Sequence, residues 1–428
     1  TANITPATIS AITGITAANK VYDGTNAATL ATGGAGFTGR LGADVLTVAT
    51  STGAFSDKNV ANGKTVNITG LTLGGADAGN YTLASSTATT TANITPATIS
   101  AITGITAANK VYDGTNAATL ATGGAGFTGR LGADVLTVAT STGAFSDKNV
   151  ANGKTVNITG LTLGGADAGN YTLANATAST TANITPATIA AITGITAANK
   201  VYDATTAATL TTTAAGFTGK VTGDNLTVAT STGTFSDKNV ANGKTVNITG
   251  LTLGGTDAGN YTLASNTAST TANITPAQLT AITGITAANK VYDTTTAATL
   301  TTTGAAFTGK ITGDVLTLGA APTGNFSDKN VANGKTVSIS GITLGGTDAG
   351  NYNLQSSTAS TTANITPATI SAITGITAAN KVYDGTANAT LNTGSAGFTG
   401  KLGSDVLTVA TSTGSFSDKN VANGKTVS

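Results

Sequence analysis

The segment GGADAGNYTL (74–83) recurs along the chain, and its tyrosine gives a direct measure of the period. Tyr81 follows an aspartate, Asp77, by four positions and precedes an apolar residue, Leu83, by two. The same tyrosine returns in three further copies of the segment, at Tyr171, Tyr261 and Tyr352. Steps of 90, 90 and 91 residues separate the four tyrosines. The sequence is therefore a tandem array of similar units.

A second recurring segment, TANITPA, follows the tyrosine and sets the repeat boundaries. It begins at Thr1, Thr91, Thr181, Thr271 and Thr362. A period of this length is typical of a small domain, so we expect each repeat to carry its own core. We expect residues 1–6 to be the last strand of an upstream repeat, followed by repeats 1 to 4 at 7–96, 97–186, 187–276 and 277–367, and an incomplete repeat 5 at 368–428.

Composition and alternation predict an all-β fold. Glu and Met are absent, Thr, Val and Ile are abundant, and 55 residues are Gly, a mixture that disfavours helices and favours strands. DVLTVAT (44–50) places Leu46 and Val48 on one face of a strand. Val45 precedes Leu46 and becomes Asn225 in repeat 3, so this position should point outward.

Two turn signals lie in the segment KNVANGKTVNITGLTLG (58–74). Asn62-Gly63 predicts a hairpin turn, because both turn positions need a positive φ. After Gly70 the alternation of apolar residues changes phase, from Val66 and Ile68 to Leu71 and Leu73. This change of phase predicts a bulge or a strand end at Gly70.

The Asp-x-Gly-x-Tyr pattern of residues 77–81 resembles the tyrosine corner of immunoglobulin-like sandwiches, in which the hydroxyl bonds backbone a few residues upstream. The resemblance implies structural tyrosine corners at Tyr81, Tyr171, Tyr261 and Tyr352. Leu83 stands where an antibody domain has its second cysteine, and the chain has neither Cys nor Trp. The predicted fold class is all-β, a tandem array of roughly 90-residue immunoglobulin-like β-sandwich domains that forms an elongated rod.

Three motifs in fixed order resemble the YDG repeat domains found in tandem in very large bacterial surface adhesins of the filamentous-haemagglutinin type. They are NKVYDGTNAATL (19–30), GAFSDKNVANGKTVNITGLTLGGADAGNYTL (53–83) and TANITPA (91–97). The resemblance covers essentially the whole chain and implies an extracellular, repetitive adhesin region with no catalytic residues. Ala204 and Thr294 replace Gly24 of the YDG triplet, which suggests that this glycine is dispensable.

The charge balance and the missing residue types exclude several functional classes. Lys and Arg number 20 against 19 Asp, so no basic field is expected to hold nucleic acid or an anionic membrane. His and Cys are absent, which removes imidazole bases, thiol nucleophiles and the usual transition-metal ligands. We expect no enzyme, no cofactor, no metal site and, within this sequence, neither a membrane span nor a signal peptide.

KVYDG (20–24) is the most site-like stretch, because Lys20, Tyr22 and Asp23 lie within four positions. In an extended strand Lys20 and Tyr22 share a face and Asp23 points to the other. We therefore interpret the stretch as a strand end, with Tyr22 over the core, Lys20 in solvent and Asp23 starting a turn.

A covalent cross-link is the alternative for the same residues. Lys20 or Lys64 could form an isopeptide bond with Asn80, with Asp23 or Asp57 as the proton shuttle. Asn80 is equally well explained as a turn residue. The adjacent charges of SDKNV (56–60) predict a solvated edge that discourages aggregation between similar repeats.

These observations predict a structural stalk or fibre segment of a large exported bacterial adhesin, on the cell surface or secreted. The expected partners are the neighbouring repeats and, in a fibre, other copies of the protein, while the sequence identifies no host ligand. Two alternatives stay open. The repeats could bind glycan or self-associate through avidity, or incomplete terminal domains could polymerise by strand exchange.

Overall fold

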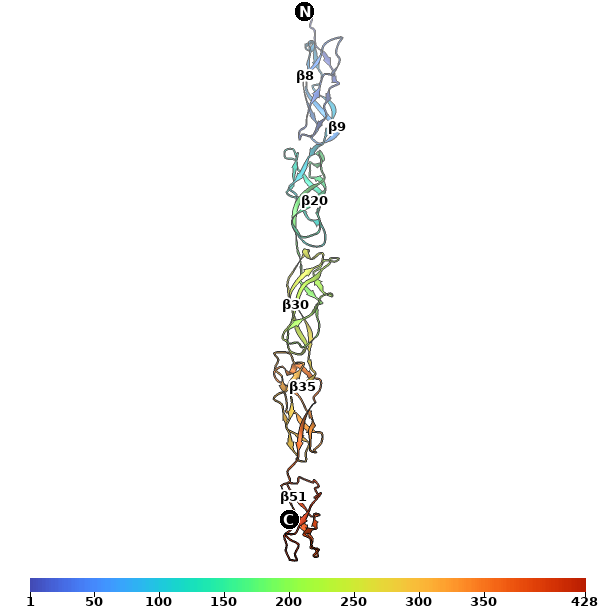
Figure 1. The fold of residues 1–428 in the computed structure, drawn as a ribbon. Coiled ribbons are helices and arrows are strands. Elements are labelled where there is room, and N and C mark those ends of the chain that lie inside the picture. The colour runs from blue at the N-terminus through green and yellow to red at the C-terminus, as the bar shows by residue number, and fades with distance from the viewer. The chain divides into compact units, whose positions relative to one another are not determined.

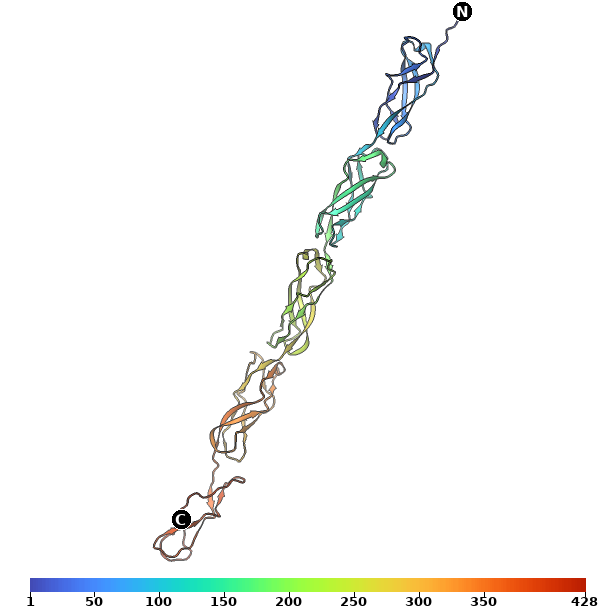
Figure 2. The same cartoon turned by 90° about the vertical axis from the view of Figure 1, so that its right-hand side faces the viewer.

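A computed structural model describes all 428 residues, which form β-strands joined by short loops (Figures 1 and 2). Each complete repeat also has a single turn of 3-10 helix. Labels in Figure 1 mark successive repeats at β8 (Thr47–Phe55), β20 (Ala151–Gly164), β30 (Thr227–Phe235), β35 (Ala281–Thr283) and β51 (Gly397–Thr399). Repeats of about 90 residues and an all-β fold are thus confirmed.

Contacts divide the structure into two compact units, and the division passes through repeat 3. The first unit comprises Thr1–Thr193, Ala215–Thr230 and Leu251–Asn266, and the second comprises Gly194–Ala214, Ser231–Gly250 and Thr267–Ser428. The boundaries of the two compact units therefore do not coincide with the boundaries of the sequence repeats.

Repeat 1 shows the order of elements that the other complete repeats follow. Its strands and 3-10 helix are β1 (Ala7–Ile9), β2 (Ala11–Thr13), β3 (Thr16–Ala17), β4 (Lys20–Val21), β5 (Ala27–Ala28), β6 (Leu30–Ala31), β7 (Gly36–Thr38), β8, β9 (Ala61–Gly74), η1 (Ala78–Asn80), β10 (Tyr81–Leu83) and β11 (Ala88–Thr95). In repeat 4 the counterpart of β8 is split into β41 (Thr317–Leu318) and β42 (Thr323–Phe326), where the chain has its extra residue.

Each complete repeat packs two β layers. One layer is a five-stranded sheet in the order β4-β11-β9-β8-β5, with β9 antiparallel to both of its neighbours and β4 parallel to β11. The other layer consists of three short ladders, the parallel pair β1-β10 and the antiparallel pairs β2-β7 and β3-β6. Ile12 of β2 and Ile15, between β2 and β3, lie in one buried cluster with Ile68 from the sheet, so apolar burial holds the layers together.

The predicted orientations of side chains along β8 and the loop before it are confirmed. Val45 is 56% exposed and Leu46 only 7%, in agreement with the substitution of Val45 by an asparagine in repeat 3. The predicted irregularity at Gly70 is also confirmed, because the register between β8 and β9 shifts there. Gly70 has a φ of +64°, a conformation in which a glycine carries no steric cost.

The predicted hairpin at Asn62-Gly63 is wrong. These residues lie inside β9, and the hairpin that joins β8 to β9 is formed by residues 56–60 instead. Gly63 does have the expected positive φ, +59°. It lies in a bulge opposite β11, where Ala92 pairs with Lys64 but Ile94 pairs with Ala61. Its N–H donates to the Asn93 side chain at 2.7 Å, so the Asn-Gly signal is satisfied by a bulge.

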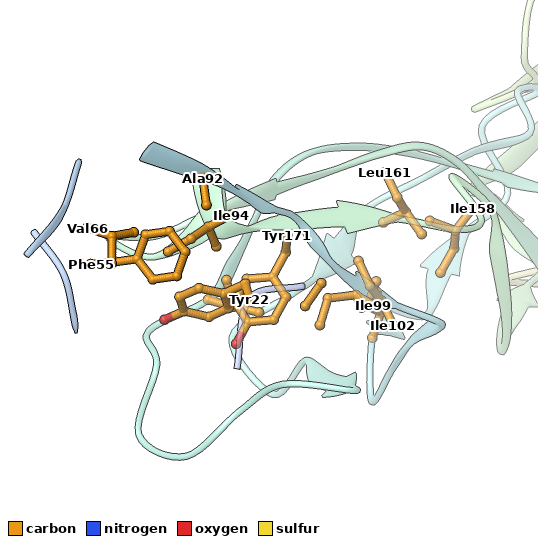
Figure 3. Packing of buried hydrophobic residues seen from close by; sticks show 13 residues of the cluster. Tyr22, Phe55, Val66, Ala92, Ile94, Ile99, Ile102, Ile158, Leu161 and Tyr171 are labelled. Atoms are coloured by element: carbon orange, nitrogen blue, oxygen red, sulfur yellow. The ribbon is translucent and has the colours of Figure 1, made fainter. Parts of the chain in front are cut away.

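The expectation of one separate core per repeat is also wrong. Residues of repeat 1 and residues of repeat 2 together form one buried cluster (Figure 3). It contains Tyr22, Phe55, Val66, Ala92 and Ile94 from repeat 1, and Ala97, Ile99, Ile102, Ile105, Leu136, Ile158, Leu161 and Tyr171 from repeat 2. A different cluster, which includes Ile9, Ile12 and Leu71, lies within repeat 1.

The connection between repeats explains why their cores merge. Only Pro96 separates β11 from β12 (Ala97–Ile99), which pairs with β21 (Tyr171–Leu173) of repeat 2. Proline fixes φ and keeps the preceding residue extended. The chain therefore passes from one sheet to the next ladder without a linker, and Ile94 and Ile99 enter the same apolar cluster.

Candidate functional site: the junction between repeats

A buried carboxylate lies at the junction between repeats 1 and 2. Asp134 of repeat 2 is buried, with 6% of its side chain exposed. A carboxylate in such a position must be paired or hydrogen-bonded to be stable. Its partners come from both repeats, and together they define what we call the junction site: Tyr22, Lys58, Asp134, Asp167, Asn170 and Tyr171.

Repeat 2 supplies Asp134 and Tyr171 to the junction site. Asp134 lies in the loop before β19 (Thr137–Phe145), and its N–H donates to the Leu131 carbonyl at 3.1 Å. The Tyr171 hydroxyl donates to Asp134 Oδ2 at 2.7 Å and accepts from the Leu131 N–H at 3.0 Å. The loop and the start of β21 are thereby held together within one repeat.

Repeat 1 supplies a second tyrosine and a lysine to the same carboxylate. The Tyr22 hydroxyl donates to Asp134 Oδ2 at 2.7 Å, and Lys58 Nζ donates to Oδ1 at 2.8 Å. Tyr22 is itself fixed by its N–H, which donates to the Thr95 carbonyl at 2.8 Å. Charge-assisted hydrogen bonds of this kind are stronger than neutral ones, so one carboxylate joins three side chains from two repeats.

Aromatic and cationic contacts complete the packing around Asp134. The rings of Tyr22 and Tyr171 lie side by side (Figure 3), with centroids 5.4 Å apart and an interplanar angle of 75°. This edge-to-face geometry is favourable for aromatic pairs. Lys58 Nζ lies 5.8 Å from the centroid of the Tyr22 ring and 3.8 Å from Asp167 Oδ1.

An asparagine bonds the loop of the preceding repeat beside the carboxylate. Asn170 Oδ1 accepts from the Val60 N–H at 2.9 Å, and its amide nitrogen donates to Asn59 Oδ1 at 3.2 Å. Asn170 is only 5% exposed. Its hydrogen bonds therefore stabilise the junction in a region that water does not reach.

The site keeps fixed charges at neutral pH. Burial acts to raise the pKa of Asp134, but hydrogen bonds from Lys58, Tyr171 and Tyr22 outweigh it and hold that pKa below its ordinary value. The hydrogen bond to Asp134 raises the pKa of Lys58. Burial and the bond to Asp134 raise the pKa of Tyr171 to about 12. One carboxylate, one ammonium and two neutral phenols form a binding arrangement, because none of them is activated as a nucleophile or base.

The same arrangement recurs at the next two junctions. Asp224 accepts from Tyr112 at 2.8 Å, Tyr261 at 2.6 Å and Lys148 at 3.1 Å. Asp314 accepts from Tyr202 at 3.1 Å, Tyr352 at 2.6 Å and Lys238 at 3.1 Å. The junction site is therefore a property of the repeat.

Of the residues in KVYDG, only Tyr22 belongs to the junction site. Tyr22 is 2% exposed, as expected for a residue over the core. The prediction that Lys20 lies in solvent is wrong. Its Nζ donates to Asp23 Oδ1 at 2.8 Å, the Thr25 carbonyl at 2.8 Å and the Ala27 carbonyl at 3.0 Å. The strand β4 ends at Val21, so the chain turns and brings Asp23 back to Lys20.

The cross-link candidates are not brought together. Lys20 lies next to Tyr22, at the end of repeat 1 that meets repeat 2. The other candidate lysine, Lys64, donates from Nζ to Asp57 at 2.6 Å. Asn80 precedes Tyr81 at the other end of the repeat, since its counterpart Asn170 faces the preceding repeat. Lys20 and Asn80 of one repeat are therefore at opposite ends.

The tyrosines of GGADAGNYTL bond backbone differently from a tyrosine corner. The Tyr81 hydroxyl accepts from the Leu41 N–H at 2.9 Å and donates to Asp44 Oδ2 at 2.6 Å. Leu41 lies 40 residues upstream, whereas the corner motif uses a group a few residues upstream. Tyr171, Tyr261 and Tyr352 make the same bond, to Leu131, Val221 and Ile311 respectively.

Sequence reasoning missed the carboxylate and the lysine of the junction site. Asp44 and its counterparts were not singled out from the sequence as site residues, and Lys58 was expected on a solvated edge. Lys58 crosses to Asp134, while its neighbour Asp57 pairs with Lys64. A usable signal is that Asp44 and Lys58 are unchanged in every copy, whereas the neighbouring Val45 varies.

Comparisons with known proteins identify the family. The family model described as the YDG domain matches residues 5–91, 95–181, 185–269, 275–361 and 366–428. The chain belongs to the YDG domain family and consists of five tandem copies of that domain. A search of curated proteins finds no match.

Two solved structures align with much of the chain at low similarity. The surface layer protein SbsC, domains 4–9, is 12% identical, with 92% of this chain and 71% of that chain covered and a TM-score of 0.14. The N-terminal eight Ig domains of Down Syndrome Cell Adhesion Molecule are 10% identical, with 90% and 58% covered and a TM-score of 0.15. No helix in the structure is long and apolar enough to cross a membrane.

Proposed function

We propose that the chain is a structural stalk segment of a large exported bacterial adhesin, which holds a binding region away from the cell surface. Its partners in this role are the neighbouring repeats of the same chain. The proposal assigns it no enzymatic activity, no cofactor and no nucleic-acid ligand. The observation that supports it most is the junction site, which returns at each boundary between complete repeats.

A stalk must resist bending at the places where its domains meet, and the junction site supplies that resistance. The connection between repeats 1 and 2 is a single proline, and the buried cluster continues through it. Asp134 fixes Tyr22 and Lys58 in direction as well as distance, because hydrogen bonds are directional. Bending at the junction would break these bonds and expose apolar surface.

Merged cores also make neighbouring repeats support each other against unfolding. The stability of a repeat array is approximately the sum of the stability of each repeat and the energy of each interface between neighbours. An interface that buries side chains therefore raises the free energy needed to unfold one repeat alone. If repeat 1 unfolded, Tyr171 of repeat 2 would lose its ring contact with Tyr22, and Ile99 would lose part of its buried cluster. A mechanically loaded stalk benefits from this coupling.

The proposal can be tested by measuring how far the chain extends from a cell surface. The full chain is placed between a membrane anchor and a fluorescent protein, and the height of the fluorophore is measured by axial super-resolution imaging. We expect a height that falls when Asp134, Asp224 and Asp314 are all replaced by alanine, while Asp44→Ala leaves it unchanged. An unchanged height in the triple variant, or a wild-type height no greater than that of a glycine-serine linker of equal length, would contradict the proposal.

A further inference from the structure

The outer face of the five-stranded sheet carries an asparagine that the fold does not use. Asn67, Asn157 and Asn247 occupy one position in the central strand of repeats 1, 2 and 3, and all three are exposed. Their side-chain amides make no hydrogen bond within the protein. Asparagine is disfavoured in strands, so its return at this position is not explained by folding.

Each of these asparagines begins the tripeptide Asn-Ile-Thr. Thr69 follows Asn67 by two residues, and the two side chains lie on the same face of the strand because side-chain direction alternates. Thr69 is exposed, whereas Ile68 between them is buried. Asn-x-Ser/Thr is the tripeptide recognised by enzymes that attach sugars to asparagine.

Repeat 4 has lost this asparagine and carries another directly beside it. Ser338 occupies the position of Asn67, and Asn325 pairs with Ser338 across β42 and β43 (Ala332–Ser340). Paired residues of antiparallel strands project from the same face. Asn325 is exposed and begins the tripeptide Asn-Phe-Ser. Every complete repeat therefore presents an exposed acceptor tripeptide at nearly the same place on its sheet.

The cross-strand neighbours leave room for a bulky substituent. Ala54 and Thr89 flank Asn67, and Ala144 and Ser179 flank Asn157. In repeat 4 the position opposite Asn325 is the small Ser338. None of these neighbours reaches over the asparagine as an aromatic or long side chain would.

Burial and hydrogen bonding set these positions apart from the other recurring Asn-x-Thr tripeptides. Asn93 Oδ1 accepts from the Gly63 N–H at 2.7 Å and supports a bulge. Asn170 and Asn260 are each 5% exposed in the junction site. A sugar on any of these three would disrupt packing. The tripeptides at Asn3, Asn80, Asn175, Asn225 and Asn388 are exposed too, but each is exposed at one place in the chain only.

We propose that Asn67, Asn157, Asn247 and Asn325 are acceptor sites for N-linked glycosylation, one on each complete repeat. The amide nitrogen attacks the anomeric carbon of a sugar activated as a phosphate ester. A carbon–nitrogen bond forms, the bond from that carbon to the phosphate oxygen breaks, and the phosphate leaves with the electron pair. The amide proton passes to a base of the transferase. The sugars would cover the polar face of each sheet and keep similar repeats from associating.

The first test maps the sugars on the chain made by its native cells. Peptides from the purified protein are analysed by mass spectrometry, and we expect hexose-containing modification at the four named asparagines and none at Asn93, Asn170 or Asn260. Unmodified peptides at all four positions would overturn the proposal. That result would leave the stalk function intact, because the junction site shares no residue with these positions.

The second test moves the acceptor in repeat 4. The full chain, with an added flexible Asn-Ala-Thr tail as an internal control, is expressed with a soluble Asn-x-Ser/Thr glycosyltransferase that uses nucleotide-activated hexose. We expect Asn325→Ala to remove one hexose from the intact mass. Adding Ser338→Asn to that variant should restore the hexose, because the second substitution creates an Asn-Ile-Ser tripeptide at residues 338–340.

Two outcomes of the second test count against the proposal. A tail that carries hexose while the four named asparagines do not would overturn it. So would an Asn325→Ala chain that keeps the wild-type number of sugars.

Discussion

The junction between repeats 1 and 2 and the junction between repeats 4 and 5 use the same residues with different results. Asp134 accepts from two tyrosines and has 6% of its side chain exposed. Its counterpart Asp405 accepts from Tyr292 alone at 2.8 Å, and 23% of its side chain is exposed. Lys58 lies 2.8 Å from Asp134, but Lys329 lies 3.7 Å from Asp405.

The difference follows from what residues 368–428 contain. They include no counterpart of Tyr171, since Ser428 corresponds in position to Asn67. The cluster around Phe326, Val337 and Ile365 in repeat 4 correspondingly includes no residue of repeat 5. The second tyrosine and the strands around it are therefore what buries the carboxylate and merges the cores. This comparison predicts unequal effects for equivalent mutations at the two junctions.

The largest effect is expected for removal of the shared carboxylate. Asp134→Ala leaves Lys58 and two hydroxyls without their acceptor, and should destabilise the chain by about 3 kcal/mol, as breaking a buried pair does. Asp405→Ala removes a more exposed partner and should cost less than about 1 kcal/mol. Urea unfolding followed by tyrosine fluorescence measures both, because the chain has nine Tyr and no Trp.

A matched control for this pair is Asp44→Ala, which changes the same position in repeat 1. Asp44 accepts from the Tyr81 hydroxyl, a bond within repeat 1, and no hydrogen bond across a junction reaches it in residues 1–428. The free energy of unfolding lost in Asp44→Ala should lie between the losses in Asp134→Ala and Asp405→Ala. Equal effects at all three positions would show that the carboxylate acts within one repeat rather than across the junction.

A smaller effect is expected when only a hydroxyl is removed. Tyr22→Phe keeps the ring against Tyr171 but removes a buried hydrogen bond to a charged group, and should cost about 2 kcal/mol. Tyr292→Phe at the half-buried fourth junction should cost about 1 kcal/mol or less. Hydrogen exchange of peptides from each repeat locates the loss. Protection that falls in repeat 1 but not in repeat 2 would contradict a merged core.

Acid should weaken the complete junctions through Asp134, Asp224 and Asp314. Their pKa values lie below the ordinary 3.8 in the folded chain, so the folded state binds fewer protons than the unfolded state. The stabilisation is full above about pH 5 and is lost as the pH falls below 3.8 through the folded pKa values. We expect a shallower fall in melting temperature below about pH 4 for the triple alanine variant. An identical slope would mean that other carboxylates carry the acid sensitivity.

The smallest effect concerns the turn after Asp293, close to the fourth junction. Gly24 has a φ of +78°, and Thr294 at the same position has a φ of +69°. A β-branched residue is strained there. Thr294→Gly should therefore stabilise repeat 4 by about 1 kcal/mol, whereas Gly24→Ala should destabilise repeat 1. A loss of stability in Thr294→Gly would show that the turn does not need a positive φ.

The tandem β repeats and the orientations of Leu46 and Val45 could be predicted from the sequence, because alternation and period are local properties. The junction site could not be predicted in the same way. Tyr22 and Asp134 are 112 residues apart, and their contact depends on how two repeats dock. The Asn62-Gly63 signal was local too, yet it fits both a hairpin and a bulge, and only pairing with β11 decides between them.

The same reasoning explains why KVYDG looked like a self-contained site. Lys20 and Asp23 do pair with each other, but as a turn that closes the end of β4. Tyr22 between them points to the next repeat. A motif that repeats with the domain can serve the boundary between domains, and only a structure with two adjacent copies distinguishes this role from a role within one copy.

The most direct measurement of coupling between repeats is a double-mutant cycle on Tyr22 of repeat 1 and Asp134 of repeat 2. Free energies of urea unfolding are measured for the wild type, Tyr22→Phe, Asp134→Ala and the double variant. A coupling energy above about 1 kcal/mol is expected, because the two side chains share a buried hydrogen bond. Effects that add to within about 0.3 kcal/mol would show that the repeats are energetically independent and would contradict the account.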